Sequence, residues 1–248
     1  MKIKYLVFLA AAGILLFSAC KSSPRPRGKD FSPHAPLALV TVVSNQDINW
    51  EGEKTREEDF ISGFIRNTLR LNRDASRVRI SSADTMIDEA DEILRKVIAD
   101  ARVFVLADKE RITDSHAYWT SSRNANLPSG QIVAQGYRYL NHRDRQFAAQ
   151  LSEENGVRSL LYVNFTFNKK MVSGFAKTGR CRALVKMRAV VVSPQGKTVF
   201  RYEIETRSSD RIDVKSGSYD EEEFMDLLRE AIGEACYRFI WKFRGTRI

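Results

Sequence analysis

The chain has 248 residues, of which 43% are hydrophobic and 29% are charged, with only 13 Gly and 6 Pro. This composition is typical of a globular protein and excludes a collagen-like, low-complexity or wholly disordered chain. The 40 Lys and Arg residues exceed the 31 Asp and Glu residues and give a formal net charge of +9. A chain of this length buries a full hydrophobic core without disulfides or a metal.

The N-terminus has the pattern of an export signal. Two lysines precede an apolar run over residues 6–17, which is too short to span a bilayer as a helix. Residues 17–20 (FSAC) resemble the bacterial lipoprotein box, in which the cysteine becomes the lipidated first residue of the mature protein. The resemblance implies removal of residues 1–19 as a signal peptide and lipidation of Cys20, although Phe17 stands where Leu is usual. An ordinary signal peptide cleaved nearby is the alternative.

Export and lipidation restrict the partners. The pattern predicts a cell-envelope lipoprotein held to a membrane through the lipid on Cys20. Lys21 and Ser22 replace the Asp that is typical of inner-membrane retention, so we expect the outer membrane, with the protein facing the periplasm. We expect no nucleic-acid partner there. The basic charge instead favours anionic lipid, cell wall or an acidic envelope protein.

The mature chain is expected to form a tether and one domain. Residues 20–36 combine the lipidated cysteine with Pro, Ser and charged residues, which predicts a flexible tether before a single domain over residues 37–248. Residues 37–43 form a near-continuous β-branched run, which predicts a strand buried on both faces. A polar loop over residues 44–54 and a helix over residues 55–71 are expected next.

The middle of the chain alternates short apolar runs with helical periodicity. Residues 78–80 indicate a short strand, and the apolar spacing over residues 84–100 predicts a helix. Residues 103–106 read as a second short buried strand, and residues 107–141 show no regular pattern. A helix is expected over residues 144–154, where an Asn-Gly pair provides a C-cap.

Three segments of alternating hydrophobicity then predict an antiparallel meander over residues 158–167, 180–193 and 197–207. A final helix is expected after a capping box formed by Ser218 and Glu221. These elements predict an α/β (α+β) fold, a single mixed-sheet domain with a C-terminal three-stranded meander and helices packed on the sheet. The patterning requires a register that sets two pairs of opposite charge across the strands: Arg188 with Glu203, and Lys186 with Glu205.

Residues 147–163 (FAAQLSEENGVRSLLYV) look like the "helix, Gly-Val/Ala, strand" element of bacterial envelope lipoproteins with a small α/β domain. A meander and a C-terminal helix also follow this element in the curli-secretion lipoprotein and in the lipoprotein activators of penicillin-binding proteins. The resemblance covers residues 140–243 and implies a periplasmic scaffold or partner-binding domain. It implies no catalytic residue and no cofactor.

The sequence contains no Gly-rich phosphate loop and none of the His-Glu-x-x-His, Cys-x-x-Cys or Gly-x-Ser-x-Gly motifs. We therefore expect a non-catalytic module without a metal or cofactor. One alternative is a cell-wall or glycan hydrolase that uses Asp47 and Glu51, which requires two carboxylates about 5–9.5 Å apart in one pocket. Another alternative is a homo-oligomeric structural lipoprotein of the secretion type, in which the hairpin at residues 168–179 extends on assembly.

Two cysteines remain beside Cys20. Cys181 faces the core from a predicted strand, and Cys236 lies at the edge of the apolar stripe of the last helix. The periplasm permits a disulfide between them. Two buried thiols packed as small hydrophobic side chains are the favoured alternative.

Three segments are candidates for partner binding. The loop after the first strand lies where ligands bind in α/β sheets, although its Trp is also suited to cover the core. The irregular segment over residues 116–142 mixes aromatic residues with Arg, as binding hot spots do. The loop over residues 168–179 places apolar residues between cations, unless both strands extend and pack these residues internally. The candidate contact residues are Trp50, then Tyr118, Trp119, Tyr137 and Tyr139, and then Met171, Val172 and Phe175.

Overall fold

The computed structural model describes residues 34–52, 82–120, 127–175 and 177–243. In these residues seven strands form one mixed sheet, with the order β3-β1-β4-β5-β6 and with β2 and β7 paired to β4 and β5. The sheet confirms the predicted α/β class. The strands are β1 (Leu37–Asn45), β2 (Asn49–Trp50), β3 (Gln131–Val133), β4 (Ser159–Phe175), β5 (Thr178–Val192), β6 (Thr198–Arg207) and β7 (Ile212–Val214).

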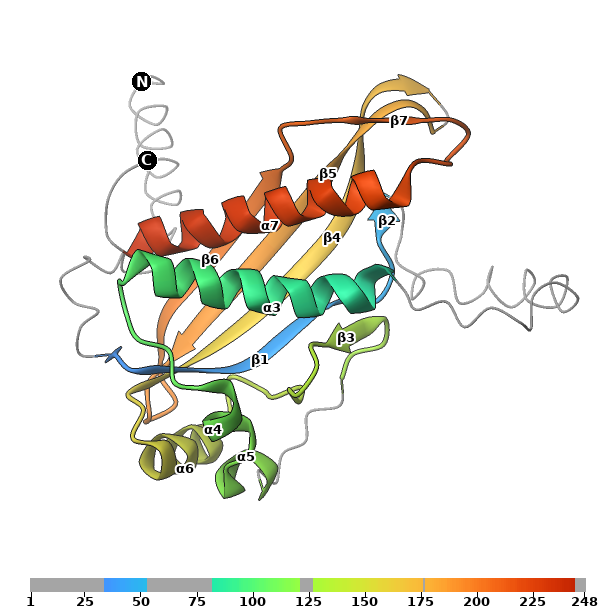
Figure 1. Ribbon diagram of the computed structural model, residues 1–248. Helices are drawn as coiled ribbons and strands as arrows, with labels where there is room; N and C mark the ends of the chain where they lie inside the picture. Colours follow the sequence, from blue (N-terminus) through green and yellow to red (C-terminus); the bar gives the residue numbers. More distant parts are fainter. Residues whose placement is uncertain (1–33, 53–81, 121–126, 176, 244–248) are drawn as a thin grey trace, which may run out of the picture.

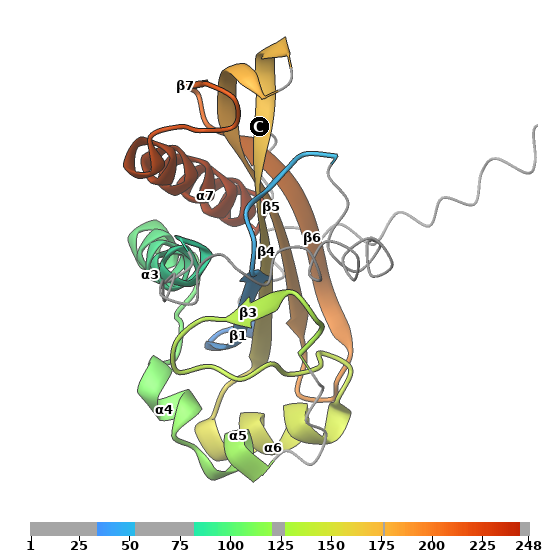
Figure 2. The same cartoon turned by 90° about the vertical axis from the view of Figure 1, so that its right-hand side faces the viewer.

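At the end of the sheet where β4 begins, helices cover both faces (Figures 1 and 2). The long helices α3 (Ser82–Ala101) and α7 (Glu221–Phe243) lie side by side on one face, where Arg229 Nε lies 2.6 Å from Glu89 Oε2. The short helices gather on the opposite face, where β4 begins. They are α4 (Lys109–Thr113), α5 (His116–Thr120) and α6 (Arg145–Asn155).

Strand β1 is buried on both faces, as its near-continuous apolar run predicts. Leu37 and Leu39 belong to the core beneath α3 and α7. Ala38 and Val40 belong to a second core with Phe147 of α6. The first strand thus lies between two helical layers and pairs in parallel with β4.

The meander has the predicted register. Arg188 lies opposite Glu203, and Lys186 lies opposite Glu205, with 3.5 Å between Lys186 Nζ and Glu205 Oε2. The inward positions of β5 are all buried. The first two strands of the meander extend further toward their shared hairpin than predicted. Strand β4 continues to Phe175, and β5 begins at Thr178.

The helices predicted over residues 84–100 and 144–154 are confirmed as α3 and α6. Asp144 caps α6 by accepting a hydrogen bond from Phe147 N, and Gly156 ends the helix with a φ of 61°. The last helix is also confirmed, but its predicted capping box is wrong. Asp220 accepts the hydrogen bond from Glu223 N (3.0 Å), because Ser218 is already held in a turn with Lys215.

The strand predicted over residues 103–106 does not form. Leu106 makes a single bridge with Leu37, the first residue of β1, and Val105 is 68% exposed. Leu37 N donates to Val105 O (2.9 Å), and Ala107 N donates to Leu37 O (2.7 Å). The segment therefore meets β1 at one residue and then leaves the sheet.

The expected loop over residues 44–54 contains a short strand, β2, and the irregular region over residues 107–141 contains α4, α5 and β3. The signal peptide, Cys20, the helix over residues 55–71 and the strand at residues 78–80 lie outside the described residues, so these expectations stay predictions. Among the described residues, the structure contains no helix that is both long enough and apolar enough to cross a membrane.

Candidate functional site

Three elements that are distant in sequence meet where β4 and β5 form their hairpin (Figure 1). Strand β2 runs parallel to β4 and places Trp50 beside Lys169. Strand β7 pairs with the start of β5, opposite residues 179–181. We call this part of the molecule, over residues 169–181 with β2 and β7, the hairpin end.

At the tip of the hairpin the backbones of β4 and β5 approach each other closely. Gly174 and Gly179 face each other with φ values of 104° and 139°, and a Cβ on Gly174 would lie 2.0 Å from Thr178 O. Only glycine allows this approach of the two backbones. The loop after β7 braces the turn, because Gly217 N donates to Lys177 O (2.8 Å). The tip is therefore a defined structure.

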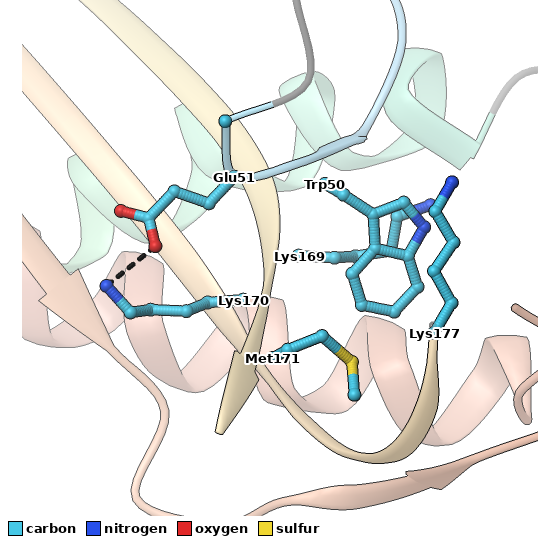
Figure 3. Close-up of a pocket in the computed structure, with 7 residues that line it drawn as sticks. Trp50, Glu51, Lys169, Lys170, Met171 and Lys177 are labelled. Carbon is cyan, nitrogen blue, oxygen red and sulfur yellow. Dashed lines mark ion pairs between the residues drawn. The ribbon is translucent and has the colours of Figure 1, made fainter. Parts of the chain in front are cut away.

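A hollow of about 380 Å³ opens at the hairpin end (Figure 3). Lys170 Nζ lies 2.6 Å from Glu51 Oε2 on one side of it, and Lys169 and Lys177 lie beside the Trp50 ring on the other. Among the described residues that line it, three ammonium groups and one carboxylate give a formal charge of +2 at neutral pH. These residues are Trp50, Glu51, Gly52, Lys169, Lys170, Met171 and Lys177.

Trp50 both closes the core and forms a wall of this hollow. Its side chain is only 9% exposed and belongs to the core beneath α3 and α7, as the alternative interpretation expected. Lys169 Nζ lies 5.4 Å and Lys177 Nζ 5.9 Å from the ring centroid, which are cation–π distances. Lys169 Nζ also donates a hydrogen bond to Tyr219 Oη (3.3 Å). The cation of Lys169 is thus held in place between two aromatic rings.

The apolar residues of the tip are partly in solvent. Phe175 is 88% exposed and Val172 is 39% exposed, whereas Met171 is half-buried beside the hollow. Both strands extend as the alternative interpretation expected, but Phe175 does not pack internally. The hairpin end therefore presents an aromatic ring in solvent next to a cationic hollow.

Two candidate contact residues of the irregular segment belong to the core instead. Tyr118 is fully buried, donates a hydrogen bond to Val40 O (3.0 Å) and accepts one from Arg138 N (2.8 Å). Burial raises the pKa of Tyr118 to about 12. Tyr137 is 8% exposed. Buried hydroxyls with these partners offer no surface to another molecule, which corrects their candidate role.

Tyr137 belongs to a buried ionic cluster around Asp91. Its hydroxyl donates to Asp91 Oδ1 (3.1 Å) and accepts from Arg95. Asp91 also lies 3.0 Å from Arg95 Nε and 2.9 Å from Lys109 Nζ. Burial raises the pKa of Tyr137, and the neighbouring Asp91 charge raises it further. The cluster ties α3 to α4 and to the loop before α6, which is a structural role.

Trp119 and Tyr139 are the other candidates from this segment. Trp119 is 58% exposed, with the Arg138 guanidinium carbon 5.0 Å from its ring, and Tyr139 is half-buried. Trp119 lies on α5, at the end of the sheet opposite the hairpin end (Figure 1). The structure therefore brings Trp50 and Met171 together and leaves Trp119 apart from them.

The two carboxylates of the hydrolase alternative do not share a pocket. Asp47 lines a second hollow of about 390 Å³ beside Asn45, Asn164 and Gln131, whereas Glu51 lines the hollow at Trp50. Neither hollow contains a second Asp or Glu from the described residues. The same part of the chain contains no group of three His, Cys, Asp or Glu side chains that could hold a metal.

Cys181 and Cys236 are two separate, buried thiols, which is the arrangement that the sequence analysis favoured. Burial raises the pKa of the Cys181 thiol to about 11, and burial also raises the pKa of Cys236. Both thiols are therefore poor nucleophiles near neutral pH.

Sequence reasoning found most of the described lining but missed Tyr219, which does not line the hollow and accepts a hydrogen bond from Lys169 Nζ. The apolar and basic residues of the hairpin stand close together in sequence, whereas Tyr219 follows 50 residues after Lys169. No local pattern marks this contact. It arises because the loop after β7 returns to the hairpin.

No protein-family model and no curated protein matches this chain. Among solved structures, the chain is similar to LpoB of E. coli, with 11% identity and a TM-score of 0.31 over 68% of this chain and 54% of that one. The chain thus spans about half the length of that LpoB structure.

Two further likenesses are broader in coverage. Lipoprotein GNA1162 of Neisseria meningitidis shares 10% identity, with a TM-score of 0.31 over 81% of this chain and 98% of that one. Protein CT253 of Chlamydia trachomatis shares 8% identity, with a TM-score of 0.32 over 82% and 91%. At these TM-scores the likenesses carry no argument about function, so we base the function on the chain itself.

Proposed function

We propose that this chain is an envelope lipoprotein, anchored through Cys20, that acts as a non-catalytic binding or scaffold module for another component of the cell envelope. The lipoprotein-box pattern at residues 17–20 and the tether composition of residues 20–36 support the anchor and the periplasmic location, with the outer membrane as the expected site. We assign the docking surface to the hairpin end.

The exposure of Phe175 is the observation that carries this proposal. An aromatic side chain that is 88% exposed, at the tip of a braced hairpin, has no structural use within the described residues. Contiguous exposed apolar patches rimmed by polar residues mark interaction sites, and Val172, on the same hairpin, adds apolar surface to that of Phe175. Aromatic residues are also enriched at the centres of interfaces. The cationic hollow beside Trp50 supplies the charged rim.

The position of the hairpin end also suits a docking role. Leu37, where the domain begins, pairs with Ser159 at the start of β4, and Phe175 lies 16 residues further along the strand, roughly 50 Å away. A flexible tether of the length from Cys20 to Leu37 has a typical span of roughly 20–25 Å. Since the tip lies farther from Leu37 than this span, a domain anchored at Cys20 can reach envelope components well away from the anchoring membrane through its hairpin end.

The test is site-specific photo-crosslinking in cells. A photoreactive residue replaces Phe175 in one strain and Val105 in a matched control, since Val105 is 68% exposed at the opposite end of the sheet. We expect position 175 to crosslink one envelope component that position 105 does not reach. Equal crosslinking from both positions contradicts the proposal. A crosslinked product that contains only this chain would instead assign the hairpin end to a homo-oligomer.

A further inference from the structure

The face of the sheet opposite α3 and α7 carries arginines that the hairpin end does not use. Arg201 of β6 lies opposite Val190, and Arg188 precedes Val190 by two residues on β5, so both share the face of the second core. Arg188 and Arg201 are exposed, as is Arg143 in the loop before α6. Within the described chain, none of these three guanidinium groups forms an ion pair with a carboxylate.

The surroundings of His142 show that the three arginines converge. The His142 ring packs edge-on against Tyr162 of the second core, with 6.1 Å between the ring centroids. Burial lowers the pKa of His142, and the charges of Arg201, Arg143 and Arg188 lower it further. A loop and two strands thus bring three cations around one half-buried imidazole.

The neighbouring carboxylates do not cancel this charge. Glu205 is shared by two cations, since Lys186 Nζ lies 3.5 Å from one of its oxygens and an Arg207 nitrogen 2.8 Å from the other. Glu203 lies opposite Arg188. Together with the arginines around His142, these described residues carry a formal charge of +3. We call them the basic face: Arg143, Lys186, Arg188, Arg201, Glu203, Glu205 and Arg207.

We propose that the basic face binds the phosphate groups of anionic lipid headgroups, in the membrane leaflet that holds the anchor at Cys20. Guanidinium groups bind phosphate oxygens in pairs, and an anionic membrane surface attracts basic side chains. This inference rests on the anchor of the proposed function and adds a second contact with the membrane. The short helices α4, α5 and α6 pack near the start of β4 and leave the basic face exposed in the described part of the chain (Figure 2).

The position of the basic face favours the anchoring leaflet over a distant protein. Arg201 and Tyr162 lie opposite the same residue of β5, and Tyr162 follows the β4 partner of Leu37 by three residues. At the spacing of residues and strands in a sheet, Arg201 is roughly 20 Å from Leu37. The flexible tether from Cys20 to Leu37 has a typical span of roughly 20–25 Å. The basic face therefore reaches the membrane without stretching the tether.

The test maps the residues that touch lipid in a bilayer. The full-length chain, purified from the membrane fraction, is reconstituted into nanodiscs whose lipid headgroups carry a photoreactive diazirine. One set contains anionic phosphatidylglycerol and the other only zwitterionic phosphatidylcholine. Mass spectrometry locates the crosslinks and also shows whether Cys20 carries lipid. We expect headgroup crosslinks on the basic face in the phosphatidylglycerol discs, and fewer of them as salt concentration rises.

Two double variants sharpen the test. Arg188→Gln with Arg201→Gln should lower the yield of these crosslinks at least about fivefold, because each basic residue near an anionic surface changes the bound population by about that factor. The matched control is Arg211→Gln with Lys215→Gln, which removes two exposed cations on either side of β7. This control should crosslink as the parent does, and thermal melts should show that both variants are folded.

Other outcomes overturn the inference. Equal crosslinking of the basic face in both sets of discs shows that it does not recognise anionic headgroups. An anchored chain without headgroup crosslinks on this face has no second membrane contact, and an acidic envelope protein crosslinked there in cells would be its occupant instead. If position 175 still crosslinks a partner in cells, either result leaves the proposed docking role standing. A chain without lipid on Cys20 removes the anchor, and with it both the proposed location and this inference.

Discussion

At the end of the sheet where β1 and β4 begin, the rings of Phe147 and Tyr118 are buried beneath helices, whereas at the hairpin end the ring of Phe175 stands in solvent. Phe147 and Tyr118 are 1% and 0% exposed, and Phe175 is 88% exposed. Both ends mix aromatic residues with Lys and Arg in sequence. The comparison shows that such a mixture does not by itself mark an exposed surface, because the helical layer buries Phe147 and Tyr118, whereas Phe175 has no layer to pack against.

The layers explain the difference. At the first end, α4, α5 and α6 pack on the second face of the sheet and enclose Phe147 and Leu151. At the hairpin end, β4 and β5 run on together, and the loop after β7 braces the turn without enclosing Phe175. The first end is therefore expected to govern stability and the second end to govern binding.

The largest expected effect is the contrast between two Phe→Ala substitutions. Phe147→Ala removes a fully buried ring and should lower the free energy of unfolding by about 3–5 kcal/mol. Phe175→Ala should change it by less than about 0.5 kcal/mol, because its ring is already in water. Urea unfolding of both variants measures the contrast, and equal losses would break the comparison.

Asp91→Asn tests the ionic cluster at the first end. It removes the charge that pairs with Arg95 and Lys109, and we expect a loss of about 2–4 kcal/mol, because the carboxylate is buried while both cations reach solvent. The control is Glu92→Gln, the exposed neighbour on α3, which should be nearly neutral. An Asp91→Asn variant with unchanged stability would show that the cluster does not hold α3 to α4.

Tyr118→Phe should have a smaller effect. The substitution keeps the ring but removes a hydroxyl that donates to Val40 O and accepts from Arg138 N. We expect a loss of about 1–2 kcal/mol in chemical unfolding, since both backbone groups lose their partner inside the protein. Tyr237→Phe, on the exposed side of α7, is the matched control and should change little. Equal losses in free energy of unfolding for the two variants would show that the Tyr118 hydroxyl does not stabilise the core.

The smallest effect concerns the meander and depends on pH. Arg207 donates a hydrogen bond to Glu205 (2.8 Å), and this contact, with Lys186 nearby, lowers the pKa of Glu205 below its ordinary value of 4.5. A lowered pKa in the folded state stabilises the protein above the ordinary value, and that contribution is lost as pH falls through the folded pKa.

Glu205→Gln should therefore cost about 0.2–1 kcal/mol near neutral pH and nothing in strong acid, where both chains are uncharged at this position. Urea unfolding of the parent and of the Glu205→Gln variant, from neutral pH down to strong acid, measures the difference in free energy of unfolding. A difference that persists unchanged in acid would mean that packing of the side chain, rather than its charge, accounts for the effect.

The parts of the fold that the sequence predicts correctly are those with a long, uninterrupted period. The alternation in β5 and the charge pairs of Arg188 and Lys186 define both the face and the register of the meander. The stripe on α7 likewise identifies its buried face. In these elements each local preference agrees with the final packing.

The parts that the sequence does not predict depend on tertiary contacts. Residues 103–106 have the composition of a strand, but they reach β1 at one residue only. The hollow also depends on such a contact, because β2 must pair with β4 across more than 100 residues before Trp50 meets Lys169. The sequence analysis identified Trp50 and the cations of the hairpin loop separately, but no local pattern predicted that they contact each other.

The most direct test of the central claim measures binding and stability on one variant. A chain with Phe175→Ala and Lys177→Gln is compared with the parent for the envelope protein that each retains after formaldehyde crosslinking in cells, and for its free energy of unfolding. We predict that the variant loses the partner at equal abundance while its stability stays within about 0.5 kcal/mol of the parent. Retention of the same partner by the folded variant would contradict the assignment of docking to the hairpin end.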